Sequence, residues 1–135
     1  MSTKFVRTTD PRRLLLTGGS SGIGFEAARQ LTRMGHDLTL ICRSQDRGRH
    51  TLDRLSDIGA DPDQVRVLPM DLGDLDDVER GCRQLLERGE HFDGLILNAG
   101  LQLAGLSVPR RSAQGIELTF AVNHLAHQWL SLIHI

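Results

Sequence analysis

A glycine-rich turn near the start of the chain constrains its fold more than any other feature of the sequence. Residues 17–24 read Thr-Gly-Gly-Ser-Ser-Gly-Ile-Gly and follow the apolar run 14–16. They lead into residues 25–34, where apolar side chains recur at the helical period. A turn from a buried strand into a helix leaves the first N–H groups of that helix without partners, at the positive end of the helix dipole. Such a turn can hold an anion, for which the pyrophosphate of a dinucleotide is the expected ligand.

The glycines of this turn have separate expected tasks. Gly18 allows a tight turn, Gly22 lets the backbone approach phosphates, and Gly24 lets the helix pack against the strand. Gly and Ser also form ordinary loops, so the turn alone leaves that second interpretation open. The dinucleotide-binding residues expected here are Thr17, Gly18, Ser20, Ser21, Gly22, Ile23 and Gly24.

The rest of the chain alternates apolar strand segments with amphipathic helix segments. We expect strands at 14–17, 38–42, 65–68 and 93–97, and helices at 25–34, 46–58, 75–88 and from Ser112 onwards. The alternation predicts an α/β fold, a Rossmann-type doubly wound parallel sheet of strand order 3-2-1-4 in three α/β/α layers. With 135 residues, the chain is expected to form a single domain, 1–135. The predicted buried helix faces carry Ile23, Ala27, Ala28, Leu31 and Met34 in the first helix and Leu75, Val78, Cys82, Leu85 and Leu86 in the third.

Two loops are expected to meet at one edge of this sheet. Ligands of doubly wound sheets bind at the carboxyl ends of the strands, where the strand order reverses between the first and fourth strands. The glycine turn follows the first strand, and Asn98, Ala99 and Gly100 follow the fourth. This convergence favours the dinucleotide interpretation over an ordinary loop.

Composition argues against several other classes of partner. The net charge is −1, with 39% hydrophobic and 24% charged residues, so nothing favours nucleic acid or a membrane surface as a partner. Residues 1–10 lack the apolar core of a signal peptide, and we expect a cytoplasmic protein. Cys42 and Cys82 do not form a Cys-x-x-Cys pair, which favours incidental thiols over a redox or metal role. His124 and His127 could share a metal, but no carboxylate or Cys ligand is placed beside them, so no metal site is expected.

Four motifs, in order along the chain, resemble those of the short-chain dehydrogenase/reductase family. They are the Thr-Gly-x3-Gly-x-Gly turn at 17–24, Asp71-Leu72, Asn98-Ala99-Gly100, and the segment 122–127, Val-Asn-His-Leu-Ala-His. The resemblance covers about residues 12–130 and is closest to the retinol dehydrogenase and protochlorophyllide reductase-like branch. It implies hydride transfer between a nicotinamide cofactor and a small-molecule alcohol or carbonyl, with Asp71 near the adenine and Asn123 in a catalytic role. Asp71 could also be only a turn residue, and Asn123 only a helix residue bonded to nearby backbone.

The end of the second strand predicts which nicotinamide cofactor binds. About 20 residues after the glycine turn, an acidic residue would accept hydrogen bonds from the ribose of NAD. This chain instead has Arg43 and Ser44 there. A guanidinium is suited to the 2′-phosphate of NADP, although a solvated surface arginine is the alternative. The sequence therefore predicts NADP(H).

The sequence contains no tyrosine. The resemblance implies a Ser and a Tyr-x3-Lys pair beyond the helix that carries Asn123, so we expect an incomplete N-terminal part of a longer enzyme, inactive alone. For the parent protein, a homo-oligomer is one expected state. A non-catalytic NADP(H)-binding or redox-sensing module is the alternative function. Residues 130–135 are either the end of the last helix or a non-native tail.

Overall fold

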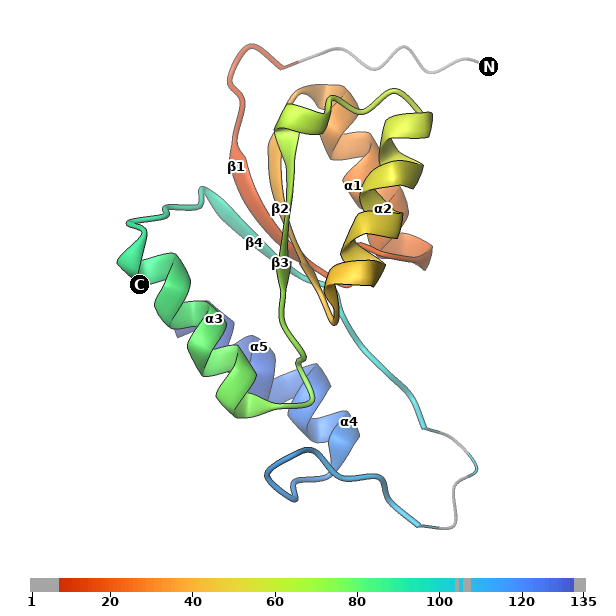
Figure 1. Ribbon diagram of the computed structural model, residues 1–135, viewed down its shortest axis with the longest axis vertical. Helices are drawn as coiled ribbons and strands as arrows, with labels where there is room; N and C mark the ends of the chain where they lie inside the picture. The colour runs from red at the N-terminus through yellow and green to blue at the C-terminus, as the bar shows by residue number, and fades with distance from the viewer. Residues whose placement is uncertain (1–7, 104, 106–107, 133–135) are drawn as a thin grey trace.

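The computed structural model describes residues 8–103, 105 and 108–132. Its centre is a parallel sheet of four strands in the order β3-β2-β1-β4 (Figure 1). This order and the α/β class confirm the predicted doubly wound topology. The strands are β1 (Arg13–Thr17), β2 (Asp37–Cys42), β3 (Val65–Pro69) and β4 (Gly94–Leu97).

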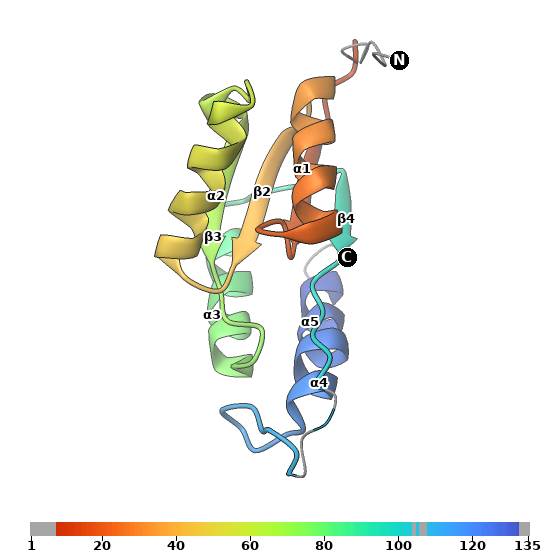
Figure 2. The same cartoon turned by 90° about the vertical axis from the view of Figure 1, so that its right-hand side faces the viewer.

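Helices cover both faces of the sheet. Successive residues of β1 point to opposite faces, so its apolar side chains contact both helix layers. Leu16 packs against α1 (Gly22–Met34) and α2 (Gln45–Asp57) in one apolar cluster with Ala28 and Leu55. Leu15 belongs to the opposite cluster, which includes Val78 of α3 (Leu75–Glu87) and Ala126 of α5 (Ala126–Leu132). In both views α1 lies beside α2, and α3 lies beside α5 (Figures 1 and 2). The result is the expected three-layer arrangement.

The central strands are deeply buried, whereas β4 is half-exposed. Leu15 and Leu16 of β1 and Leu40 of β2 have no exposed surface. β4 pairs with β1 on one side only, from Leu14↔Gly94 to Thr17↔Leu97, and Leu97 is 36% exposed. β1 and β2 therefore form the buried centre of the sheet, and the loops at their carboxyl ends extend from it.

The last helical segment begins later than predicted. Ser112 does not start a helix, because its N–H donates to the Ile116 carbonyl and its hydroxyl accepts from the Ile116 N–H in a turn. Glu117 caps the helix instead, accepting from the N–H groups of Thr119 and Phe120. The segment then runs as α4 (Leu118–Phe120), a π-helical turn η2 (Ala121–Leu125) and α5.

Two predicted core positions are wrong. Ile23 is 84% exposed, because α1 begins at Gly22 and its first turn extends beyond the carboxyl end of β1. Leu86, in the last turn of α3, is 59% exposed although Val78, Cys82 and Leu85 of the same helix are buried. The helical period is therefore correct, and the errors fall at helix ends that the sheet does not reach.

A short 3₁₀ helix, η1 (Pro62–Gln64), precedes β3. Within the described part of the chain, no helix has the length and apolar character needed to cross a membrane. α5 continues to Leu132 with Leu130 fully buried, while residues 133–135 lie outside the described residues.

Candidate functional site

The glycine turn lies at the carboxyl end of β1, and its backbone tolerates few side chains. Gly18 and Gly22 adopt φ values of +71° and +53°, a region that side chains disfavour. A Cβ on Gly24 would lie 2.0 Å from the Gly18 carbonyl oxygen, so the helix and the loop touch backbone to backbone. A Cβ on Gly22 would meet nothing within 4 Å, so this glycine faces open space. The turn is therefore tightly packed where Gly24 meets Gly18 and open at Gly22.

The start of α1 provides hydrogen-bond donors at this open side. Within the described residues, no acceptor is bonded to the N–H groups of Gly22, Ile23 or Gly24, and Ser21 forms no side-chain cap. The first turn contains no acidic residue that would offset the helix dipole. These donors form a site for an anion.

The end of β4 is joined to the turn by hydrogen bonds, as the predicted strand order requires. The Ala99 N–H donates to Thr17 Oγ1 at 2.9 Å. Asn98 Nδ2 lies 3.3 Å from the carbonyl oxygens of both Thr17 and Gly18. Thr17 is fully buried and holds the loop from within the fold, whereas Asn98 is exposed and holds it through its side-chain amide.

A cleft of about 500 Å³ extends from the glycine turn across the carboxyl ends of the strands. It brings together predicted residues that are far apart in the sequence, from the ends of all four strands. The predicted residues that line it are Gly18, Ser20, Arg43, Asp71, Leu72, Ala99 and Gly100. Ser44 does not line it, because its hydroxyl caps α2 by accepting from the Arg47 N–H at 3.3 Å. The exposed residues Ser21, Gly22 and Ile23 border the turn outside this lining, and Gly24 is buried beneath it.

Four arginines line the cleft, Arg43, Arg47, Arg110 and Arg111, and the first two form its basic wall at the end of β2. Arg43 follows β2, and Arg47 lies in the first turn of α2. Neither guanidinium has an ion-pair partner in the part of the chain that the structure describes. Burial raises the pKa of the neighbouring Cys42 thiol, and a bond to Thr51 and the charge of Arg47 offset this in part. Sequence reasoning missed Arg47, although its spacing of four residues from Arg43 was the available signal.

Asp71 forms a turn after β3 and also lines the cleft. Its Oδ1 accepts from the Gly73 N–H at 2.8 Å, which forms a local turn after β3. Its N–H donates to Asp77 Oδ2 at 2.7 Å, which ties that turn to α3. The residue is half-buried and lines the cleft beside Leu72. Asp71 is therefore a turn residue whose position also faces the cleft.

Asn123 lies in the π-helical turn η2 and does not line the cleft. Its Oδ1 accepts from the Leu101 N–H at 2.8 Å, and its Nδ2 donates to the Leu101 carbonyl at 2.9 Å. These bonds attach the helix to the chain segment that follows β4, rather than to neighbouring helical backbone. π-Helical turns often occur at functional sites.

Arg54 of α2 fastens the glycine turn from the side. Its Nη1 donates to the Ser20 carbonyl at 2.9 Å, and its guanidinium lies 3.8 Å from the centre of the Phe25 ring. Sequence reasoning did not identify this residue, because a contact across 34 positions leaves no local pattern.

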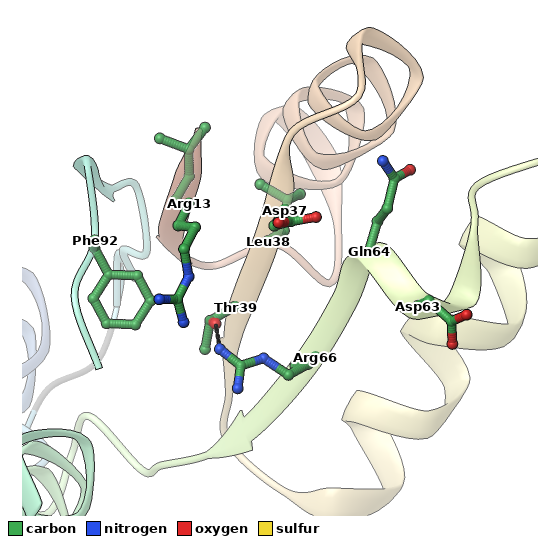
Figure 3. Close-up of a pocket in the computed structure, with 9 residues that line it drawn as sticks. Arg13, Asp37, Leu38, Thr39, Asp63, Gln64, Arg66 and Phe92 are labelled. Carbon is green, nitrogen blue, oxygen red and sulfur yellow. Dashed lines mark hydrogen bonds between the residues drawn. The ribbon is translucent and has the colours of Figure 1, made fainter. Parts of the chain in front are cut away.

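A second hollow, of about 160 Å³, lies at the amino ends of the strands (Figure 3). Its arginines already have partners. Arg66 donates to Thr39 Oγ1 at 3.3 Å and to Glu90 Oε2 at 2.5 Å, and Arg13 lies 3.6 Å from the same carboxylate. Both arginines of this hollow therefore belong to a structural ion network around Glu90.

Comparison with known proteins defines the class to which this fold and site belong. Residues 12–133 match the family described as short chain dehydrogenase, and the chain belongs to that family. This match confirms the predicted family.

Individual relatives support the predicted branch. The chain is 33% identical to retinol dehydrogenase 14 of Mus musculus over 125 residues, covering 86% of this chain and 36% of that protein. It is 29% identical to the chloroplastic protochlorophyllide reductase of Chlamydomonas reinhardtii over 121 residues, covering 89% of this chain and 30% of the relative. A short-chain dehydrogenase from Sphingobium yanoikuyae, solved in complex with NADPH, superposes with a TM-score of 0.71 at 34% identity, covering 91% of this chain and 46% of the other. The chain spans about a third of the length of the curated relatives it matches.

Proposed function

We propose that this chain binds NADP(H) in the cleft and forms the cofactor-binding part of an oxidoreductase that moves hydride between nicotinamide and an alcohol or carbonyl carbon. The observation that carries the choice of NADP(H) is the basic wall of Arg43 and Arg47, which has no carboxylate at the end of β2. A carboxylate there would favour NAD, whereas arginines suit the additional phosphate of NADP. The similarity to a protein solved with NADPH supports this choice.

The residues present fit such a cofactor. The N–H groups at the start of α1 suit the pyrophosphate, and the close contact of Gly24 with Gly18 keeps side chains out of that space. Leu72 and Asp71 offer an apolar side chain and a carboxylate to an adenine ring. Ala99 and Gly100 line the cleft at the end of β4.

When bound, the cofactor would supply the hydride, and the chain would supply its position. Thr17 and Asn98 join the end of β1 to the end of β4 by hydrogen bonds, and Arg54 bonds to the Ser20 carbonyl of the glycine turn. The start of α1 directs the positive end of its dipole towards the anion. Asn123 is the predicted candidate for a proton-relay role, and its side-chain amide is held by the Leu101 backbone. With no tyrosine in its sequence, the chain alone is proposed to bind cofactor without turnover.

The missing tyrosine also favours a second candidate, a non-catalytic NADP(H)-binding or redox-sensing module. Both candidates bind the same cofactor. They differ in the parent protein, where NADPH oxidation in the presence of carbonyl compounds supports the enzyme, and binding without oxidation supports the module.

The test of cofactor binding is a titration of the chain with NADPH and with NADH, read by quenching of its single tryptophan, Trp129, and by calorimetry. We expect Arg43→Ala to weaken NADPH binding by about 10- to 100-fold, because a charge-assisted bond contributes about 1.5–3 kcal/mol. NADH affinity should not change. Arg49→Ala is the matched control, since Arg49 lies on the adjoining helix α2 and pairs with Asp46 away from the cleft. Tighter binding of NADH than of NADPH to the unaltered chain would rule out the proposed cofactor.

A further inference from the structure

His127 lies beneath the cleft, on α5, and the proposed cofactor site does not contain it. The residue is only 8% exposed, and its Nε2 lies 3.0 Å from Thr17 Oγ1. Thr17 and His127 are 110 positions apart in the sequence, so the contact joins the start of the glycine turn to the last helix. A polar ring buried to this extent needs hydrogen-bond partners on both nitrogens.

The partners determine which nitrogen carries the proton. Thr17 Oγ1 accepts from the Ala99 N–H and keeps a second lone pair and its hydroxyl hydrogen, so it can either accept from His127 or donate to it. The backbone of Asn123, one turn earlier on the helix, bonds to the His127 ring, and its carbonyl is the acceptor that ring can donate to. Since Nε2 faces Thr17, the nitrogen that donates to Asn123 is Nδ1. The network therefore assigns a neutral ring with the proton on Nδ1 and an accepting Nε2.

These bonds form part of a closed circuit. Asn123 holds Leu101 through both atoms of its side-chain amide. Leu101 follows Ala99 by two residues, and Ala99 donates to Thr17, which contacts His127. The circuit returns from His127 to the backbone of Asn123. It fixes the glycine turn, the end of β4 and the π-helical turn relative to one another.

We propose that His127 is a positioning residue, whose neutral ring holds the Thr17 hydroxyl and the Asn123 backbone in register so that the cofactor loop and Asn123 stay aligned. The cofactor part of this inference rests on the proposed function. Burial favours the neutral ring, because it lowers the pKa of His127, and the bond to Asn123 only partly offsets this effect.

The proposal distinguishes three substitutions. His127→Phe keeps a ring of similar size but leaves the Thr17 hydroxyl and the Asn123 carbonyl without their buried partner. We expect it to weaken NADPH binding by about tenfold, the size of one lost buried hydrogen bond. His127→Gln places an amide oxygen near the position of Nε2 and should restore affinity to within about threefold. His124→Gln is the matched control, because His124 is exposed on the same helical segment and stacks on Phe120.

The decisive readout is the ¹⁵N–¹H correlation spectrum of the imidazole rings in the chain without cofactor, followed by NADPH titration of each variant. We expect His127 to carry its proton on Nδ1, and the losses for His127→Phe and Thr17→Val to be less than additive. A proton on Nε2, or a His127→Phe variant that binds NADPH like the unaltered chain, would overturn the proposal. If His127→Phe does not fold, two other results test the proposal. They are the NADPH affinity of His127→Gln and the position of the proton on the His127 ring of the unaltered chain. If the unaltered chain shows the Nδ1 proton but binds no NADPH, the proposed function fails and the hydrogen-bond circuit stands.

Discussion

The two ends of the sheet carry similar charges but use them differently. At the amino end, Arg13 and Arg66 share the carboxylate of Glu90, which is itself only 9% exposed, beside a hollow of about 160 Å³. At the carboxyl end, Arg43 and Arg47 line a cleft of about 500 Å³ and form no ion pair within the described residues. The first arrangement fixes a loop to the sheet, and the second leaves positive charge available to a ligand.

The comparison shows that an arginine's role in this fold depends on whether a carboxylate already pairs with it. A paired arginine stabilises the fold, and an unpaired arginine can bind a ligand. Arginines held by a buried carboxylate contribute to folding and lose their attraction for an external anion. Arginines beside open helix N–H groups add to the same positive field. The following substitutions alter one end of the sheet at a time.

Gly24→Val should have the largest effect at the carboxyl end. Its Cβ would meet the Gly18 carbonyl oxygen at 2.0 Å, so the turn must move. Overpacking of this kind costs about 1–3 kcal/mol, which corresponds to a loss of NADPH affinity of up to about 100-fold. The measurement is a calorimetric titration together with a thermal melt, with Gln30→Ala further along α1 as the control. Unchanged NADPH affinity would show that the turn does not hold the cofactor.

Glu90→Gln should affect the amino end only. It removes the charge that Arg13 and Arg66 share and should lower the free energy of unfolding by about 1–2 kcal/mol, because bonds to charged groups are involved but both arginines are half-exposed. The affinity for NADPH should stay within about twofold. Urea denaturation measures the first quantity, and Glu79→Ala, which breaks an exposed pair with Arg83, is the control. A large loss of NADPH affinity would mean that the two ends are not independent.

Acid should have the smallest effect, and it should act through His127. Since the pKa of His127 is lowered in the folded chain, the folded state favours the neutral ring. The contribution is fully present above the unfolded pKa of about 6.5 and decreases as the pH falls from there towards the folded pKa. Unfolding free energies at about pH 7.5 and pH 5.5 should differ less in His127→Gln than in the unaltered chain. An identical pH dependence in both would contradict this assignment.

The sequence predicts the parts of the molecule that local patterns determine. Apolar runs and helical periods predicted the strands and helices, because each of these signals lies within a few residues. Their alternation along the chain then predicted the strand order and both helix layers. Ser112 misled the prediction of a helix start, since its hydroxyl closes a turn with Ile116 while Glu117 caps the helix. Ile23 and Leu86 have the right period but lie beyond the sheet.

The contacts that complete the site could not be predicted in the same way. Arg54 reaches Ser20 across 34 positions, and His127 reaches Thr17 across 110. Each contact depends on how helices pack on the sheet, and a single sequence does not contain that information. The roles of Arg43, Asp71 and Asn123 toward a cofactor remain predictions that the proposed titrations test.

The most direct test removes two positive charges from each end of the sheet and compares NADPH binding. We expect Arg43→Ala/Arg47→Ala to weaken NADPH binding by about 100-fold, since two charge-assisted bonds are lost, and to leave NADH affinity unchanged. Arg13→Ala/Arg66→Ala, which changes the net charge equally, should lower stability but keep the affinity for NADPH. Equal losses in both variants, or retained NADPH affinity in Arg43→Ala/Arg47→Ala, would contradict the assignment of the cleft to NADP(H).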